Sequence, residues 1–107
     1  MPLLPGLPLL LTVTTMVLDL TGDGKRDMVR LEWDRTSVSV RIRFANPARP
    51  PQQFHFGVDS GREDAVCRVP VQLRREPPHG FQVVDGVCDS LHFVWNARTK
   101  RVEWWRL

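Results

Sequence analysis

The chain has 107 residues, of which 42% are hydrophobic and 25% are charged, and its formal net charge is +3. This composition is typical of a folded protein and excludes intrinsic disorder, and the length suffices for one hydrophobic core. The 15 basic residues are scattered along the chain, whereas nucleic-acid-binding proteins gather Lys and Arg among stacking aromatic side chains. We therefore expect one domain that binds no nucleic acid.

The N-terminal segment Leu3 to Leu18 is almost entirely apolar. It has neither the basic start nor the small-residue cleavage site of a signal peptide, it is short for a membrane span, and Pro2, Pro5 and Pro8 disfavour a helix. The sequence predicts an extended tail over residues 1–8, then a single β domain over 9–107 whose first strand covers 9–19. We expect no membrane span and place any export signal upstream or among removed residues.

Alternation of apolar and polar residues predicts strands along the rest of the chain. The pattern is clearest over residues 37–44, where Val38, Val40, Ile42 and Phe44 share one face. Other predicted strands cover residues 28–34, 54–58, 65–74, 81–84, 91–95 and 102–107. Turn-forming Pro, Gly and Asp residues separate them, and no segment has a helical period. The fold class is all-β, a small antiparallel sandwich or open barrel of about six to eight strands.

Cys67 and Cys88 are the two cysteines of the chain. They form either a stabilising disulfide in an oxidising compartment or a pair of buried thiols in a reducing one. Neither lies in a spacing that binds zinc. We favour the disulfide, because a calcium loop of the kind described next also belongs mainly outside the cytosol.

The loop between the first two predicted strands reads Asp19-Leu20-Thr21-Gly22-Asp23-Gly24-Lys25-Arg26-Asp27. Calcium takes about six to eight oxygen ligands, and the side chains of Asp19, Thr21, Asp23 and Asp27 stand at alternate or nearly alternate positions, with the carbonyl of Lys25 between the last two. Three crowded carboxylates repel one another unless a cation compensates. The spacing favours Ca²⁺ in a structural role, although Asp and Gly also form hairpin turns without any metal.

An EF-hand would need flanking helices and Glu where Arg30 stands. The loop instead resembles the D-x-N-G-D-G-x-x-D calcium loop of FG-GAP and VCBS-type repeats, over about residues 16–33. The resemblance implies a hairpin that binds calcium through Asp19, Thr21, Asp23 and Asp27, in an exported bacterial protein. Thr21 replaces the usual Asn or Asp, and the chain is too short for the blades of a propeller.

Trp104 and Trp105 are adjacent in the last predicted strand and must point to opposite faces. Trp33, Trp95 and Trp104 are expected in the core. Trp105 is the candidate for a surface contact, because exposed aromatic side chains on a flat sheet stack on sugar rings or anchor a protein partner.

Three functions are compatible with these features. The first hypothesis is a non-enzymatic periplasmic or extracellular binding module with a protein or glycan partner. The second is a small inhibitor of a secreted hydrolase, which would use the Pro- and Arg-rich loops Asn46 to Gln53 or Arg74 to Gly80. The third and weakest is a small hydrolase using His55, His79 or His92, since no nucleophile or metallohydrolase motif accompanies them. Acidic residues beside the predicted turns, such as Asp85 and Asp89, are expected to be solvated.

Overall fold

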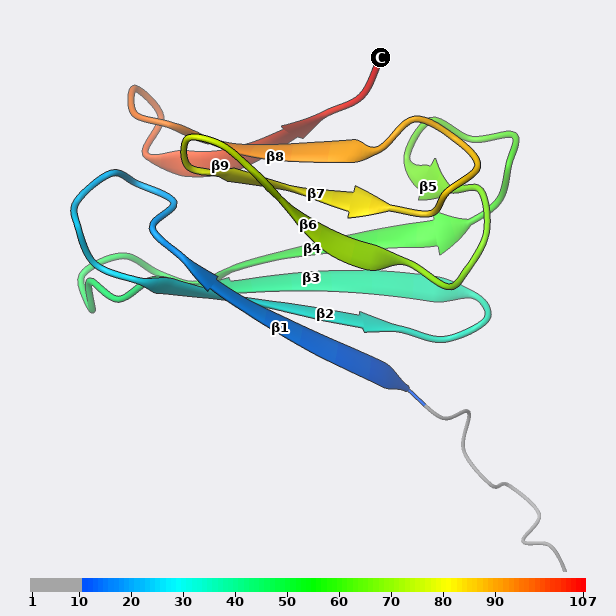
Figure 1. Ribbon diagram of the computed structural model, residues 1–107, viewed down its shortest axis with the longest axis horizontal. Coiled ribbons are helices and arrows are strands. Elements are labelled where there is room, and N and C mark those ends of the chain that lie inside the picture. Colours follow the sequence, from blue (N-terminus) through cyan, green and yellow to red (C-terminus); the bar gives the residue numbers. More distant parts are fainter. Residues whose placement is uncertain (1–10) are drawn as a thin grey trace, which may run out of the picture.

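The computed structural model describes residues 11–107 and contains nine β-strands and no helix within that range (Figure 1). The strands are β1 (Thr12–Leu18), β2 (Asp27–Trp33), β3 (Ser37–Arg43), β4 (Gln52–Val58), β5 (Ala65–Val66), β6 (Gln72–Glu76), β7 (Gly80–Val84), β8 (Leu91–Asn96) and β9 (Arg101–Trp105). The predicted tail over 1–8, and the first residues of the strand predicted over 9–19, lie outside the described residues. No helix in residues 11–107 could cross a membrane.

The strands form two sheets whose spatial order is the order of the chain. The first sheet runs β1-β2-β3-β4-β5 and the second β6-β7-β8-β9, so each is a meander of sequence neighbours. Every pairing is antiparallel except the short parallel pair of β4 and β5. The sheets face each other without closing into a barrel, so the all-β sandwich expectation is confirmed and the open-barrel alternative is not.

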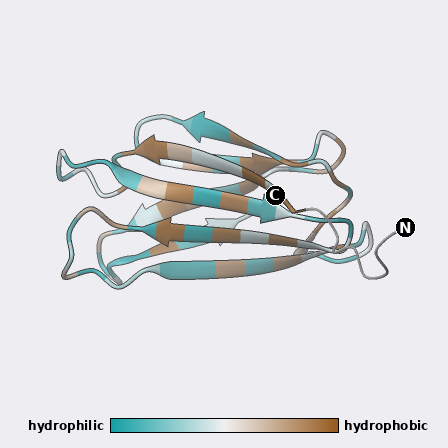
Figure 2. Cartoon of the chain, turned by 90° about the horizontal axis from the view of Figure 1, so that it is seen from below, coloured by the Kyte–Doolittle hydropathy of each residue, from teal (hydrophilic) through white to brown (hydrophobic). Residues whose placement is uncertain are grey.

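The core lies between the two sheets. Hydrophobic and hydrophilic residues alternate along the strands (Figure 2), as a half-buried strand requires. Phe81 and Phe93 are fully buried and stack at 4.7 Å between ring centroids. Each fully buried aliphatic or aromatic side chain stabilises the fold by about 1.5–3 kcal/mol. Both sheets supply core side chains: Val29, Leu31, Val38, Val40 and Ile42 from the first, and Phe81, Val83, Leu91, Phe93 and Val102 from the second.

The strand predicted over residues 65–74 is in fact two strands. Val66 ends β5 in the first sheet and Gln72 begins β6 in the second, so the chain changes sheets between them. Pro70 lies in this crossing, where its missing N–H donor costs no ladder hydrogen bond. Because of this division, the strand count exceeds the expected six to eight.

Three long-range features join the sheets. The buried side chain of Gln52 accepts a hydrogen bond from Val102 N at 2.7 Å and donates one to Val102 O at 3.0 Å, as a paired strand would. The guanidinium of Arg106 donates to the carbonyl oxygens of Glu63 and Ala65, both at 2.8 Å. The third is a disulfide between Cys67 and Cys88, which confirms the predicted pairing.

Candidate functional site

The β1–β2 loop, residues 19–26, is wound around the carboxylate of Asp19. Its two oxygens accept hydrogen bonds from the backbone N–H groups of Gly22 and Gly24, each at 2.8 Å. Both glycines have positive φ, +80° and +84°, a region where a side chain is strained. The glycine positions in the motif are therefore explained by the turn geometry that surrounds Asp19.

These contacts also stabilise the charge of Asp19. Its partial desolvation would raise the pKa of the carboxyl group, but backbone hydrogen bonds from Gly24, Gly22 and Asp23, together with the nearby His79, lower the pKa below its ordinary value. Hydrogen bonds to the ionised form have this effect because they are lost on protonation.

Asp27 lies at the other end of the loop and is 1% exposed. Its Oδ2 atom accepts a hydrogen bond from Leu20 N at 2.9 Å, and its Oδ1 atom accepts one from Ala45 N at 2.8 Å. The exposed Asp23 accepts one bond, from Lys25 N at 2.9 Å. Asp27 therefore ties the loop to the chain that follows β3, while Asp23 shapes only its own turn.

The predicted calcium ligands share the right chemistry, since all of them are oxygen donors. Thr21 Oγ1 is buried and has no hydrogen-bond partner among the described residues. Over residues 11–107, however, the only group of three or more acidic, His or Cys side chains with ligand atoms within 4.8 Å of one another is Cys67, Asp85 and Cys88. The carboxylates of the loop do not converge in this arrangement, and calcium binding stays a prediction.

The group around Asp85 is a structural staple, because two of its three members form the disulfide. Asp85 is 8% exposed, and it accepts hydrogen bonds from the backbone N–H groups of Cys67 at 2.7 Å, Val87 at 2.8 Å and Cys88 at 2.9 Å. The expectation that Asp85 is a solvated turn residue is therefore wrong. The Asp-Gly turn that the sequence indicated is present, but its carboxylate faces inward.

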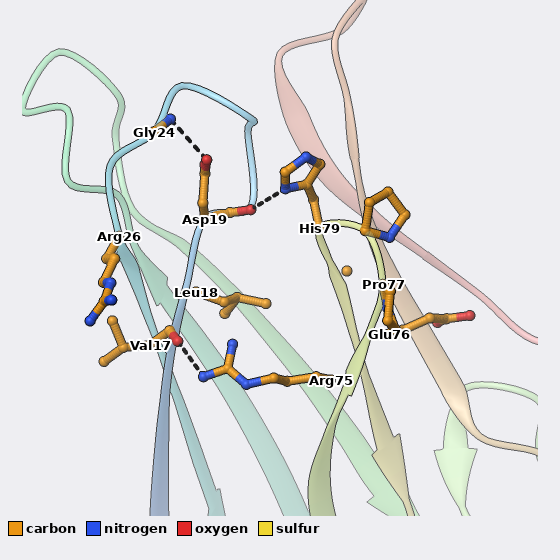
Figure 3. A pocket seen from close by; sticks show the side chains of 11 residues that line it. Val17, Leu18, Asp19, Gly24, Arg26, Arg75, Glu76, Pro77 and His79 are labelled. Atoms are coloured by element: carbon orange, nitrogen blue, oxygen red, sulfur yellow. Dashed lines mark hydrogen bonds between the residues drawn. The ribbon is translucent and has the colours of Figure 1, made fainter.

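A pocket of about 620 Å³ separates the β1–β2 loop from the β6–β7 turn, residues 77–79 (Figure 3). His79 Nδ1 donates to the carbonyl of Asp19 at 2.9 Å, and Arg75 donates to the carbonyl of Val17 at 2.7 Å. The Arg75 bond connects the edge strands β6 and β1 of the two sheets, and the His79 bond holds the β6–β7 turn against the β1–β2 loop.

Trp105 lies on the outer face of the second sheet and is 44% exposed, as predicted from its phase relative to Trp104. Its indole stacks on the imidazole of His92, with ring centroids 4.0 Å apart and planes inclined by 8°. His92 Nδ1 in turn donates to the carboxylate of Glu76 at 2.8 Å. This support fixes the orientation of the exposed indole. Trp33, Trp95 and Trp104 pack against the core, as expected.

A second pocket, of about 390 Å³, opens between Trp105 and the β6–β7 turn, and we call it the Trp105 hollow. Trp95 and Val94 contribute to the same lining, as does Thr21 from the β1–β2 loop. The hollow is lined by Leu20, Thr21, Glu76, Pro77, Pro78, His79, Gly80, Val94, Trp95 and Trp105. A loop of the first sheet and residues of the second sheet therefore meet in this hollow. The sequence did not indicate this meeting, because it depends on how the strands are paired.

The three histidines have separate roles in the described structure. His79 and His92 make the contacts given above, and His55 Nδ1 lies 3.0 Å from Ser39 Oγ on the outer face of the first sheet. The neighbouring carboxylate in register with Ser39 is that of Glu32, which pairs with Arg30 at 2.7 Å.

Comparison of the chain with protein-family models, with curated proteins and with solved structures gave no match. The functional assignment rests on the residues and their geometry.

Proposed function

We propose that this protein is a non-enzymatic, exported glycan-binding module whose binding site is the Trp105 hollow. The observation that carries the proposal is the exposed indole of Trp105, held in place by its stack on His92. A pyranose ring has an apolar C–H face and a rim of hydroxyl groups. A rigid indole binds the apolar face, and the polar side chains of Glu76 and His79, which line the same hollow, suit the hydroxyl groups.

The second wall of the hollow is also preorganised. Trp95 packs edge-to-face on Phe44 at 5.6 Å, and the guanidinium of Arg49 lies 4.6 Å from the indole centroid. Fixing aromatic side chains before the ligand arrives reduces the entropy lost on binding. Export is supported by the Cys67–Cys88 disulfide, which persists in an oxidising compartment such as the periplasm or the extracellular space.

The test is a titration with neutral mono- and oligosaccharides, followed by isothermal calorimetry and tryptophan fluorescence. Trp105→Ala is expected to weaken binding at least about tenfold, because the stacking of the sugar ring on the indole is lost. Trp105→Phe should retain part of the affinity. Val87→Ala, which truncates a side chain of similar exposure in the β7–β8 turn, is the control. Unchanged affinity in Trp105→Ala would refute the assignment of the site.

The inhibitor hypothesis remains a second candidate because the loops it names are ordered and share one end of the sandwich with the β1–β2 loop (Figure 1). Arg49 N donates to Asn46 O at 3.0 Å, and the Arg49 guanidinium is seated on Trp95. A rigid protruding loop suits insertion into an enzyme cleft. Stoichiometric inhibition of a secreted hydrolase that is lost in Arg49→Ala, with no saccharide binding, would favour this function.

We propose further that the β1–β2 loop binds one calcium ion in a structural role. Support comes from its resemblance to the FG-GAP and VCBS-type loop and from the unpartnered Thr21 hydroxyl. Because the loop carboxylates do not converge in the described structure, binding would have to draw oxygens of Asp19, Thr21, Asp23, Lys25 and Asp27 together around the ion. The ion would then compensate the negative charge of the carboxylates. A ligand that binds only the folded state must raise the melting temperature. Equal melting in calcium and in chelator, with no heat on calcium titration, would exclude it.

A further inference from the structure

The outer face of the first sheet carries a cluster of three arginines that the proposed function does not use. Arg30 on β2 lies directly opposite Arg41 on β3, and Met28 lies opposite Arg43. All four side chains are exposed. They line a surface hollow of about 160 Å³, which we call the arginine hollow.

The charges of this cluster are only partly compensated. Arg30 Nε pairs with Glu32 Oε1 at 2.7 Å, and in residues 11–107 no carboxylate lies within 4.0 Å of the Arg41 or Arg43 guanidinium. Like charges placed directly opposite each other on neighbouring strands are destabilising. The folded chain therefore maintains two uncompensated guanidinium groups around a hollow, an arrangement that an anion would stabilise.

The geometry points to a binding site for a phosphate or sulfate group. A guanidinium presents a planar fork of N–H donors that matches the oxygens of such a group, and several forks on one small hollow give specificity for a compact anion. The exposed Met28 lines one side, so the site combines charge with a small apolar contact. The site lies on the other sheet from the Trp105 hollow, so the two are independent.

The arginine hollow can be tested with inorganic phosphate, inorganic sulfate and a heparin oligosaccharide, in chloride buffer at physiological ionic strength. The variant is Arg41→Gln/Arg43→Gln. The control, Arg74→Gln/Arg101→Gln, removes the same charge from two exposed positions on the second sheet. Melting curves in low salt verify folding, and the test variant is expected to melt no lower than the wild type because it relieves repulsion.

Saturable binding that weakens at least about tenfold in Arg41→Gln/Arg43→Gln, and less than about twofold in the control, supports the site. Binding of the inorganic anions would identify a free oxyanion as the ligand, whereas binding of the heparin oligosaccharide alone would place the group on a polymer. Equal weakening in both variants would show a nonspecific effect of net charge and overturn the proposal. Failure of all three probes to bind would also overturn it.

Discussion

Two turns at opposite ends of the sandwich are each built around an aspartate, and the two aspartates differ in how deeply they are buried. In the β1–β2 loop, Asp19 organises exposed backbone amides. In the β7–β8 turn, residues 85–90, Asp85 is 8% exposed and its backbone partners include both disulfide cysteines. The first turn has the conspicuous motif, but the carboxylate at its centre, Asp19, is less buried than Asp85. Removing a carboxylate destabilises a protein most where it leaves buried hydrogen-bond donors without a partner. We therefore expect Asp85 to contribute more to stability than Asp19.

The largest effect is expected from removal of the disulfide that fixes the β7–β8 turn. Cys67→Ala/Cys88→Ala should lower the free energy of unfolding by about 2–4 kcal/mol, because the unfolded chain regains the entropy that the crosslink removes. Urea denaturation followed by tryptophan fluorescence measures the change. The wild type under reducing conditions should match the variant, and an unchanged midpoint in both samples would contradict the role given to this turn.

Asp85→Asn is the next strongest change. The amide group of asparagine would turn its N–H₂ toward at least one of the three N–H donors, leaving a partly buried donor unpaired at a cost of about 1–3 kcal/mol. Asp89→Asn, in the same turn with an exposed side chain, should stay within about 0.5 kcal/mol of the wild type. Equal losses in the two variants would mean that burial does not distinguish them.

Asp27→Asn tests the buried end of the β1–β2 loop. With chelator present, so that no metal contributes, the loss of one of its two backbone contacts should cost about 1–2 kcal/mol. Asp23→Asn, at an exposed position of the same loop, is the matched control and should have little effect. If Asp23→Asn is the more damaging of the pair, Asp27 is not the residue that anchors the loop.

The smallest effect is the acid dependence of stability. Burial would raise the pKa of Asp85, but backbone hydrogen bonds from Val87, Cys67 and Cys88 and the charge of Arg106 hold the pKa below its ordinary value. A carboxyl with a lowered folded-state pKa contributes stability above its unfolded pKa of about 3.9 and loses that contribution as the pH falls through the folded value.

The contribution of Asp85 to the denaturation midpoint should therefore be nearly constant from pH 7 down to about pH 4 and should decrease between about pH 4 and pH 2. Asp85→Asn should flatten this acid limb more than Asp19→Asn, because the carboxylate of Asp19 is the more solvated of the two and its interactions are screened. An identical acid limb in the wild type and Asp85→Asn would show that Asp85 does not titrate differently in the folded and unfolded states.

The strands could be predicted from the sequence where alternation was regular and local. Val38, Val40 and Ile42 identified the inner face of β3, and the phase of Trp104 and Trp105 placed one indole outside. The division at Pro70 could not be predicted, because the same alternating pattern continues across the change of sheet. Local periodicity says which residues share a face but not which sheet they join.

The candidate site depended more on register than on motif. The stack of His92 under Trp105 exists because these two residues are cross-strand partners of β8 and β9, and no local pattern fixes that pairing. Asp85 is similar, since Cys67, one of its donors, lies 18 residues away. The β1–β2 loop was recognisable because the hydrogen bonds of Asp19 with Gly22 and Gly24 are local. The contact of Asp27 with Ala45, 18 residues away, could not be predicted. The structure shows the hydrogen bonds that shape the backbone of this loop, and the melting experiment tests whether the loop binds calcium.

The arrangement of each sheet as one uninterrupted stretch of chain also determines how the protein should respond to cleavage. Residues 12–66 supply the whole first sheet and residues 72–105 the whole second, so the connecting residues 67–71 belong to neither ladder. A single proteolytic cut just after Arg68 would leave two fragments, each with a complete sheet. The Cys67–Cys88 bond would still join them covalently, and the nicked molecule would separate into two bands only after reduction.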